Sequence, residues 1–280
     1  MVKALQSRGH VVAMTGDGVN DVLALKEADM GIAMGTGSAA SRAVADLVLL
    51  DNRFATLPVA LAQGRRVINN IDRVANLFLT KTAYAVTLTV LVGVFGTPFP
   101  FLPRQQTLVD TFSIGVPGVV LALAANASPI RAGLLRRVLR FAIPAGLAAG
   151  IATFVVYEVT RHADDVVLDE ARTAATLTLL GLALVVLVLA SRPLAAWKVT
   201  LAAVMAASYG LIMVIEPLAD YFQLNPPPAA LWGTIITGIA LGGAVMIGVR
   251  VLTDQAEPAD GDRRDPLSHR ERADREPAGS

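Results

Sequence analysis

Two carboxylates near the amino terminus have the type and spacing of a metal site. Asp17 and Asp21 are four residues apart within the string Thr15-Gly16-Asp17-Gly18-Val19-Asn20-Asp21. If Asp17 closes a turn and Asp21 lies in the first turn of a helix, both carboxylates converge on one point. Two such hard oxygen ligands, completed by water molecules, suit Mg²⁺, whose usual further partner in proteins is phosphate. The Asn20 side chain adds an amide donor for a phosphate oxygen beside them.

The residues around this string predict the turn that it needs. A short apolar run, residues 10–14, precedes it, and a helical pattern, residues 22–28, follows it. Gly16 and Gly18 allow backbone angles that a side chain would forbid, so the backbone can approach a ligand closely. In an open α/β sheet, ligands bind at the carboxyl ends of the strands, where this turn would lie. The alternative is a surface turn that happens to hold two aspartates.

The same string continues into a longer motif, Ala24-Leu25-Lys26-Glu27-Ala28-Asp29-Met30-Gly31-Ile32-Ala33-Met34-Gly35. It closely resembles the hinge motif of P-type ATPases, ion pumps that phosphorylate themselves on an aspartate and whose phosphorylation domain has the haloacid dehalogenase-like fold. The resemblance implies that Asp17 and Asp21 hold the catalytic Mg²⁺ and that Asn20 touches the phosphoryl group, with ATP as the substrate of the complete pump. The phosphate loop would then consist of Thr15, Gly16 and Gly18.

Two charged residues fall in segments that are apolar enough to lie in a membrane. Lys81 lies in the first such segment, and Asp110 lies near the start of the second. Charges at these places are costly and usually functional, and the two could pair across neighbouring helices. The small hydroxyl ligands around them are Thr80, Thr82 and Ser113.

Pro117 adds an irregular turn to the second of these segments. Because it has no N–H, the carbonyl of Ser113, four residues earlier, loses its helical partner. Gly115 and Gly118 loosen the same turn. A freed carbonyl beside Asp110 suits a cation, because irregular backbone at membrane depth persists only where something lines it. The alternative is a proline kink with a structural Lys–Asp pair.

The resemblance to P-type ATPases extends to this region. Those pumps place their ion site between the fifth and sixth membrane helices, around such a Gly-x-Pro break. The positions that bind cations in calcium-type pumps fall here on Thr80, Thr82, Asp110 and Ser113. Where those relatives carry acidic residues, this sequence has Ala85 and Ile114, and Lys81 adds a positive charge. Two-ion calcium transport is therefore in doubt.

The expected cargo is consequently Ca²⁺ or another small cation. It would be bound singly, or exchanged for protons with Lys81 as an internal counter-charge. The full expected transported-ion site consists of Thr80, Lys81, Thr82, Asp110, Ser113 and Pro117.

The composition predicts a membrane protein. Of the 280 residues, 54% are apolar, and the mean hydropathy is +0.56, which is too apolar for an ordinary soluble domain. The formal net charge of +1 argues against a nucleic-acid partner. Because the sequence has no cysteine, disulfides and thiolate metal sites are excluded.

The first 53 residues predict part of an α/β domain. Strand candidates at residues 11–14, 30–34 and 47–50 alternate with helix candidates at residues 22–28 and 38–45. This alternation with short connections predicts a parallel sheet. So short a segment can hardly build a doubly wound core. Residues 1–53 are therefore expected to be the carboxy-terminal part of a cytoplasmic phosphorylation domain, a partial haloacid dehalogenase-like domain of Rossmann type.

A stalk and a membrane domain are expected to follow. Residues 54–76 predict an amphipathic stalk helix that runs without a breaker into a first span, residues 77–95. The string Gly-Arg-Arg-Val-Ile-Asn-Asn at residues 64–70 is similar to the stalk of P-type ATPases; the alternative is two helices joined by a polar linker. Five further spans complete an α-helical multi-pass domain of six transmembrane helices, residues 77–252. They are residues 107–125, 138–157, 173–190, 199–215 and 229–251.

Basic residues predict the orientation of the spans. Among the loops between the spans, those after the second and fourth spans hold most of the basic residues, namely Arg131, Arg136, Arg137, Arg140, Arg192 and Lys198. Such loops face the cytoplasm, so both termini are expected there, in a multi-pass protein of the plasma membrane surrounded by membrane lipid. Residues 253–280 mix charges with Pro and Gly and predict a disordered cytoplasmic tail.

Several parts of a complete pump do not occur in the sequence. They include the phosphorylated aspartate in its Asp-Lys-Thr-Gly-Thr setting, the nucleotide-binding domain and the Thr-Gly-Glu loop. Without a nucleophile nothing takes the phosphoryl group, so this chain alone is expected not to hydrolyse ATP through a phosphoenzyme.

Three hypotheses follow. In the first, the chain is a truncated part of an ATP-driven cation pump. In the second, it is a non-catalytic membrane remnant, or a subunit that needs a separate amino-terminal half. The third, a membrane-tethered phosphatase, would need a nucleophilic aspartate on an early strand, and none precedes Asp17.

Overall fold

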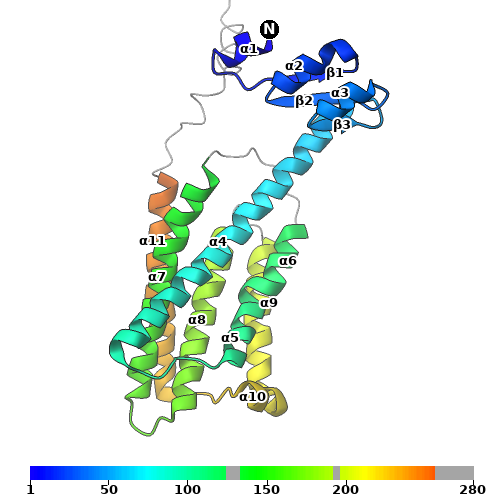
Figure 1. The fold of residues 1–280 in the computed structure, drawn as a ribbon. Helices are drawn as coiled ribbons and strands as arrows, with labels where there is room; N and C mark the ends of the chain where they lie inside the picture. The colour runs from blue at the N-terminus through cyan, green and yellow to red at the C-terminus, as the bar shows by residue number, and fades with distance from the viewer. Residues whose placement is uncertain (124–132, 192–195, 256–280) are drawn as a thin grey trace, which may run out of the picture. The chain divides into compact units, whose positions relative to one another are not determined.

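The computed structural model describes residues 1–123, 133–191 and 196–255 (Figure 1), and these residues belong to two compact units, Met1–Arg66 and Val67–Ser280. The predicted tail lies outside the described residues from residue 256 onwards. Arg131 and Arg192 also lie outside them.

The first unit is built on a parallel sheet of three strands in the order β1-β2-β3. The strands are β1 (Ala13–Gly16), β2 (Met30–Met34) and β3 (Leu47–Leu49). The central strand is apolar and buries Ile32 and Ala33, and Leu25 and Leu49 are buried as well. In the register of the sheet Thr15 lies opposite Ile32, which in turn lies opposite Leu47. The predicted parallel sheet is therefore present.

Strand β1 begins two residues later than the sequence predicts. The backbone N–H of Val12 donates to Asp29 Oδ2 at 2.8 Å, and the Val12 carbonyl accepts from the N–H groups of Asp29 and Met30. Because the Asp29 carboxylate takes this donor, the ladder of β1 starts only at Ala13. The segment ahead of it forms a short helix, α1 (Val2–Gln6), that the sequence analysis did not predict.

Short helices connect the strands. Between β1 and β2 lie a 3₁₀ turn, η1 (Val19–Asp21), and α2 (Val22–Glu27). Helix α3 (Ala39–Val44) precedes β3 and begins at Ser38, whose hydroxyl accepts from the backbone N–H of Ser41 at 3.0 Å. Serine is favoured at this capping position because it satisfies an otherwise unpaired backbone donor.

A second 3₁₀ turn, η2 (Phe54–Thr56), leads into α4 (Leu57–Phe95), a single unbroken helix. The alternative of two helices with a polar linker is therefore wrong. The remaining elements are α5 (Pro103–Asp110), the π-helical η3 (Thr111–Gly115), α6 (Val116–Leu123), α7 (Leu134–Arg161), α8 (Leu168–Ala190), α9 (Ala196–Val214), α10 (Glu216–Phe222), the 3₁₀ turn η4 (Ala229–Leu231) and α11 (Trp232–Gln255).

Among the described residues, five helical segments are long and apolar enough to cross a membrane. They are Phe54–Phe95, Leu134–Arg161, Leu168–Ala190, Ala196–Val214 and Ala229–Gln255. The sixth predicted span, residues 107–125, coincides with the interrupted segment α5–η3–α6, and its last two residues are outside the described part of the chain. Helix α7 begins before the predicted span, so Arg136, Arg137 and Arg140 lie on a helix rather than in a loop.

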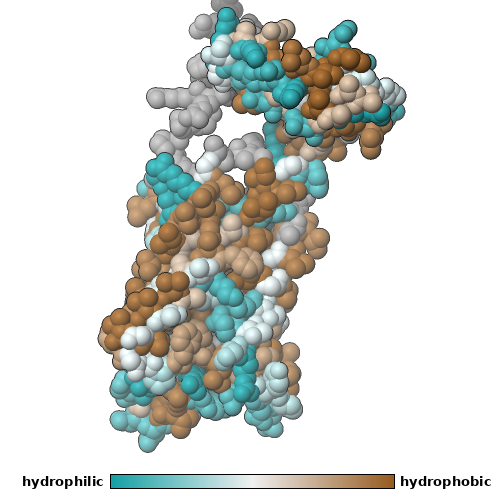
Figure 2. All heavy atoms as spheres, viewed as in Figure 1, coloured by the Kyte–Doolittle hydropathy of each residue, from teal (hydrophilic) through white to brown (hydrophobic). Residues whose placement is uncertain are grey.

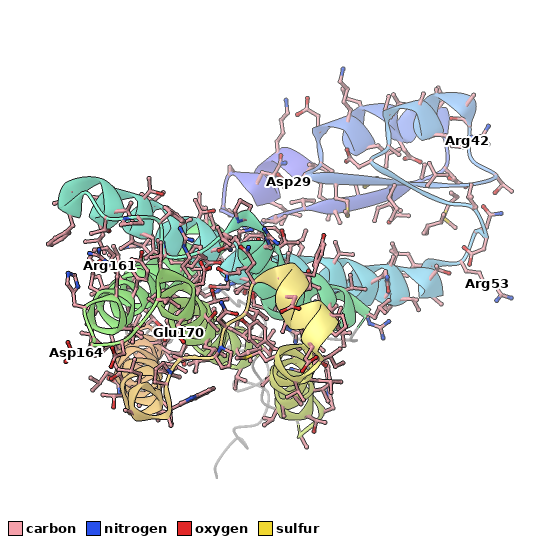
Figure 3. All side chains as sticks on the ribbon, turned by 90° about the horizontal axis from the view of Figure 1, so that it is seen from below. Asp29, Arg42, Arg53, Arg161, Asp164 and Glu170 are labelled. Carbon is pink, nitrogen blue, oxygen red and sulfur yellow. The ribbon has the colours of Figure 1, made fainter. Side chains whose placement is uncertain are left out.

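Helix α8 lies at the centre of the second unit and packs with α7, α11 and α9. Its buried side chains include Leu179 and Leu182, which share a core with Phe141, Tyr157 and Met246. On the face of the bundle that Figure 2 shows, many of the residues are apolar, and hydrophilic residues gather towards the end where α7 joins α8. Three charged residues at that junction, Arg161, Asp164 and Glu170, are labelled in Figure 3. An apolar flank with a polar end is what a lipid bilayer requires.

Candidate functional site

The loop between β1 and α2 is held by the carboxylate of Asp21. Its Oδ2 accepts from the backbone N–H groups of Asp17 at 3.2 Å and Gly18 at 3.1 Å. Because the Asp21 side chain folds back under the loop, a Cβ added to Gly16 would lie 2.6 Å from the Cβ of Asp21. Only glycine permits this approach at Gly16.

Helix α3 supports the same loop from the other side. The backbone N–H of Ser38 donates to the Asp17 carbonyl at 2.8 Å. The Ser41 hydroxyl is fully buried, lies 3.1 Å from the carbonyls of both Asp17 and Gly18, and is also hydrogen-bonded to the Ser38 hydroxyl. A Cβ on Gly37 would come within 2.9 Å of the Asp17 carbonyl. The sequence analysis missed these supports, although a serine at the start of a predicted helix was a signal for them.

The loop leaves its chemical groups accessible. Thr15, Asp17 and Asn20 are exposed, and within the described residues the Asp17 carboxylate has no hydrogen-bond partner. One oxygen of Asp21 holds the loop, which leaves the other for a ligand. The carboxylate oxygens of Asp17 and Asp21 fit Mg²⁺, because this ion binds one or two carboxylates and keeps water and phosphate as its remaining ligands. No larger cluster of His, Asp or Glu that could hold a metal was found in the described part of the chain. That Asp17 and Asp21 converge on one ion stays a prediction.

Two other aspartates of the first unit have structural partners that lower their pKa. The Asp29 carboxylate accepts from the Val12 N–H and the Gln6 amide, and these hydrogen bonds hold its pKa below the usual 3.8. The pKa of Asp51 is lowered by the Thr56 hydroxyl, 2.6 Å from its Oδ2, and by the backbone N–H of Arg53. Figure 3 labels Asp29 and Arg53. These carboxylates fix turns and are therefore distinct from the loop around Asp17.

A second set of functional groups lies in the second unit. Lys81 Nζ on α4 lies 2.6 Å from Asp110 Oδ2 at the end of α5, so the two charges form the expected ion pair. About a quarter of the Asp110 side chain and a third of the Lys81 side chain are accessible, at 27% and 33%. The pair is thus partly enclosed, and its lysine lies on a helix that is long and apolar enough to span a membrane.

Two residues that the sequence analysis missed complete this ion pair. The Gln106 amide nitrogen donates to Asp110 Oδ1 at 2.9 Å and lies 3.3 Å from the hydroxyl of Tyr84, which is buried on α4. Each Asp110 oxygen therefore has one donor, an ammonium on Oδ2 and an amide on Oδ1. The signal in the sequence was spacing: Gln106 precedes Asp110 by four residues, and Tyr84 follows Lys81 by three.

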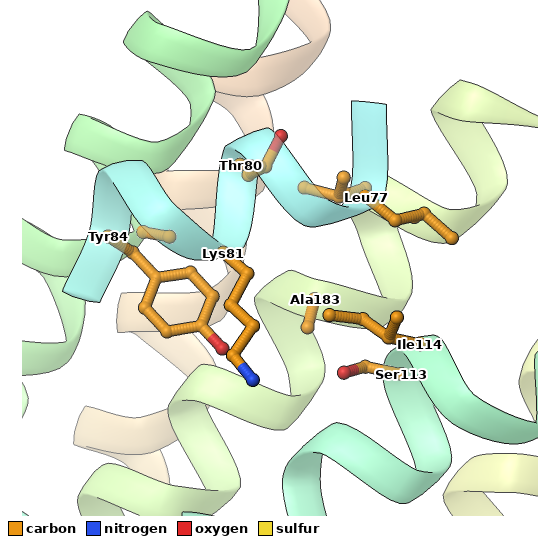
Figure 4. A pocket seen from close by; sticks show the side chains of 9 residues that line it. Leu77, Thr80, Lys81, Tyr84, Ser113, Ile114 and Ala183 are labelled. Atoms are coloured by element: carbon orange, nitrogen blue, oxygen red, sulfur yellow. The ribbon is translucent and has the colours of Figure 1, made fainter. Parts of the chain in front are cut away.

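A small cavity lies beside the pair (Figure 4). Its volume is about 10 Å³, and it is lined by Leu77, Thr80, Lys81, Tyr84, Ser113, Ile114, Ala149, Ala183 and Val186. A volume near ~10–15 Å³ is what a single water-sized group needs. The hydroxyls of Thr80 and Ser113 donate to their own helices, to the Asn76 and Val109 carbonyls at 2.7 Å. Each of these hydroxyl oxygens keeps a lone pair that its own bond does not use.

The backbone next to this cavity is irregular, as the sequence predicts. The irregular part is the π-helical segment Thr111–Gly115, in which the N–H of Val116 donates to the Thr111 carbonyl. Because Pro117 cannot donate to the carbonyl of Ser113, the hydrogen-bond ladder shifts by one residue ahead of it. Single π-helical turns of this kind occur frequently at functional sites. Pro117 itself is buried.

Not all predicted groups reach the ion pair. The Thr82 side chain is exposed, and its hydroxyl donates to the Phe78 carbonyl on its own helix. Ile114 lines the small cavity, and Ala85 lines a larger one of about 410 Å³ beside α4 and α5. The structure therefore brings Lys81, Asp110, Thr80 and Ser113 into one region, and leaves Thr82 on the outer face of α4.

Comparison with known proteins gives one match for the first unit and several for most of the chain. Residues 1–58 match the family of haloacid dehalogenase-like hydrolases. The calcium-transporting ATPase CtpE of Mycolicibacterium smegmatis is 51% identical over 262 residues, covering 89% of this chain and 33% of the relative. The protein of the same name from Mycobacterium tuberculosis is 48% identical over 259 residues, covering 88% of this chain and 32% of the relative.

A more distant relative agrees with these two. A probable cation-transporting ATPase of Streptococcus pneumoniae is 43% identical over 155 residues, which cover 52% of this chain and 20% of that protein. The chain spans about a third of the length of the calcium-transporting ATPases that it matches.

Proposed function

We propose that this chain, a homologue of cation-transporting P-type ATPases over most of its length, carries two working parts of an ATP-driven cation pump. One part is the Mg²⁺ side of the phosphorylation site, in the first unit. The other is the site of the transported cation, in the second unit. The similarity to calcium-transporting ATPases supports the proposal, and so does the presence of five apolar helices in the described residues.

The observation that carries the proposal is the environment of Asp110. A carboxylate in a membrane-spanning segment is costly unless it is paired, and such groups mark ion pathways. Asp110 is paired with Lys81, adjoins a π-helical turn and lies near a cavity lined by the hydroxyls of Thr80 and Ser113. A structural Lys–Asp pair alone would need neither the irregular turn nor the polar cavity.

In the first unit, Asp17 and Asp21 would hold Mg²⁺. The ion, when bound, would neutralise negative charge on the phosphoryl group during its transfer. Asp21 also fixes the loop through Gly18 and Asp17, so the position of the ion site is coupled to the backbone. Asn20, exposed in the same turn, would donate to the phosphoryl group. ATP would be the phosphoryl source of the whole pump.

The ion pair limits the cargo. Asp110 is the only carboxylate of α5, and α4 contributes Lys81 and Ala85 to the same region rather than a second acid. One carboxylate with neutral oxygens around it suits one small cation, Ca²⁺ or another, rather than two calcium ions. The cation would have to displace the Lys81 ammonium, which makes Lys81 an internal counter-charge.

The membrane setting follows from the same proposal. The chain is a multi-pass membrane protein, and we place it in the plasma membrane with both termini in the cytoplasm. Basic residues support this orientation: Arg136, Arg137 and Arg140 lie in the first two turns of α7, at one end of the bundle. Membrane lipid would surround the apolar outer faces of the helices.

A second candidate keeps the same sites but adds a separately supplied amino-terminal half. The observation that favours it is the open edge of the sheet: among the described residues β1 pairs with β2 alone. The Asp17 loop lies at the end of this strand, so a further strand on that edge would bring its own carboxyl end next to the loop.

Equilibrium binding tests the proposal on the purified chain in lipid nanodiscs. We would measure ⁴⁵Ca²⁺ binding to the wild type, to D110N and to the double variant D110N/K81M, which removes both charges and so leaves none unpaired. Both variants are expected to bind Ca²⁺ at least about tenfold more weakly, a loss of ~1.4 kcal/mol. The matched control is T107V on the exposed face of α5, whose affinity should be unchanged. Wild-type affinity in the folded double variant would refute the site.

A further inference from the structure

One buried hydrogen-bond acceptor near Asp110 lacks a donor within the described part of the chain. The Gln106 amide uses its nitrogen for Asp110 and Tyr84, and its carbonyl oxygen, Oε1, is buried without a hydrogen-bond partner among the described residues. Leaving a buried acceptor without a donor is unfavourable, because the group loses its hydrogen bonds to water. A group in this position is therefore expected to gain a donor in some other state of the molecule.

The Gln106 side chain borders a cavity that has room for a hydrogen-bond donor. A cavity of about 410 Å³ is lined by Lys81, Tyr84, Ala85, Thr89, Phe99, Phe101, Leu102, Pro103 and Gln106. Lys81 and Tyr84 also line the small cavity (Figure 4), so both residues contact the two spaces. Ala85 is one helical turn beyond Lys81 on the same face of α4, and its small side chain leaves room for the lysine side chain to swing.

A cation that binds to the Asp110 carboxylate would take the place of the Lys81 ammonium, so the lysine side chain has to move. Asp110 Oδ2 is occupied by the Lys81 ammonium at 2.6 Å, so a cation that binds there must displace it. Two positive charges held side by side on one carboxylate repel each other strongly. An ammonium that leaves its carboxylate in a low-dielectric site also needs new oxygen acceptors. Gln106, whose carbonyl oxygen has no donor among the described residues, and Tyr84, which has a hydroxyl, line the larger cavity together with Lys81.

We propose that Gln106 and Tyr84 form a second seat for the Lys81 ammonium, in the larger cavity, which the lysine occupies while a cation is bound at Asp110. Lys81 then alternates between two positions, on Asp110 without the cation and on Gln106 Oε1 and the Tyr84 hydroxyl with it. The inference rests on the proposed function, because it needs a cation at Asp110. It makes Gln106 a positioning residue that acts through Lys81 and does not touch the cation.

Two other roles for Gln106 predict different behaviour. If its oxygen bound the cation directly, removing the amide would weaken binding whether or not Lys81 is present. If Gln106 only oriented Asp110, its removal would likewise act in both backgrounds. In the seat model the amide also acts through Lys81, beyond its hydrogen bond to Asp110, so its removal weakens binding more when the lysine is present than when it is absent. A double-mutant cycle separates these cases because it measures the coupling of two residues.

The experiment measures ⁴⁵Ca²⁺ affinity of the full chain in nanodiscs for the wild type, Q106M, K81M and Q106M/K81M. Methionine keeps the length of both side chains and removes their polar ends. We expect K81M to bind Ca²⁺ about tenfold more tightly than the wild type and Q106M about tenfold more weakly. Because Q106M also removes the donor to Asp110 Oδ1, Q106M/K81M should bind more weakly than K81M, but by a factor at least about threefold smaller than the factor between Q106M and the wild type. T107V again serves as the control on α5.

The other possible results of the double-mutant cycle contradict the proposed second position of Lys81. Equal weakening by Q106M in both backgrounds would show that Gln106 acts on the cation or on Asp110, and no effect in either would show that it has no part. If Q106M does not fold, Y84F removes the other acceptor and is used in the same cycle with the same expectation. If D110N/K81M binds Ca²⁺ as K81M does, or if no variant binds Ca²⁺, the proposed function fails, and the seat fails with it.

Discussion

At the scale of single residues, the Asp17 loop depends on groups that have no catalytic chemistry. Asp21 holds two backbone N–H groups with one oxygen, and Ser41 lies against two loop carbonyls while fully buried. The sequence predicts the chemical residues of the loop, because their types and spacing are local. Ser41 acts on Asp17 from 24 residues away, and spacing in the sequence does not reveal such a contact.

The first prediction concerns Ser41. S41A removes the buried hydroxyl and its hydrogen bonding to the Asp17 and Gly18 carbonyls, which keep their backbone donors, so the free energy of local opening around the loop should fall by about 0.5–1.5 kcal/mol. Hydrogen exchange of the β2 amides measures this opening. S7A is the control, because the Ser7 hydroxyl is exposed and donates only to the Ala4 carbonyl. Equal effects of the two variants would contradict the supporting role of Ser41.

The second prediction concerns Asp29 and pH. Its pKa in the folded unit is below 3.8, so its contribution to stability is present above about pH 4 and is lost as the pH falls through the lower folded value. The protection factor of the Val12 amide, which donates to this carboxylate, should therefore be flat from pH 7 to about pH 4 and decrease below it. In D29N the amide should be less protected at neutral pH and lack this acid transition. A transition of the same size in D29N would assign the effect to another group.

At the scale of elements, the contact of α4 with α7 supports the membrane site. A Cβ added to Gly146 on α7 would lie 2.3 Å from the Cβ of Ala83, 2.8 Å from the Thr80 carbonyl and 3.0 Å from the Tyr84 nitrogen. Glycine thus lets the two backbones approach closely, as small residues do between membrane helices. The approach sets the position of Thr80 and Tyr84, which line the small cavity.

The third prediction is that G146A pushes α7 away from α4. Overpacking of this kind costs about 1–3 kcal/mol, and Ca²⁺ binding should weaken because the cavity lining moves. The matched control is G93A on α4, where an added Cβ meets no atom within 4 Å and alanine is the better helix former. Thermal unfolding in nanodiscs and ⁴⁵Ca²⁺ affinity check both effects. A G146A variant as stable as G93A would show that the helices can separate at little cost.

The helices also show which parts of the fold can be predicted from the sequence. Apolar length predicts the long helices well, because a membrane span needs about 20 apolar residues and little else. It predicts their ends less well: α7 starts at Leu134 rather than at Val138, since basic residues are tolerated in the first turns of the helix. The short helix α10 falls in what reads as a loop, and the larger cavity depends on side chains brought together from α4, α5 and the loop before α5.

At the scale of the whole molecule, the relation to calcium-transporting ATPases joins the two sites in one proposed mechanism. The resemblance of the Asp17 motif to P-type ATPases is confirmed by relatives that cover 89% of the chain. The relatives' length, about three times that of the aligned part, means that the activity of a whole pump is a proposal for this chain. Residues of the pump that do not occur in this sequence would have to supply the nucleophilic aspartate.

The most direct measurement replaces the aligned third of a calcium-transporting relative with this chain and follows ATP-dependent ⁴⁵Ca²⁺ uptake into inside-out membrane vesicles. We predict that the hybrid takes up Ca²⁺ above the level of empty vesicles, and that D110N in the hybrid reduces uptake to that level while T107V leaves it unchanged. Uptake by a D110N hybrid equal to that of the unmodified hybrid, at equal amounts of folded protein, would contradict the account.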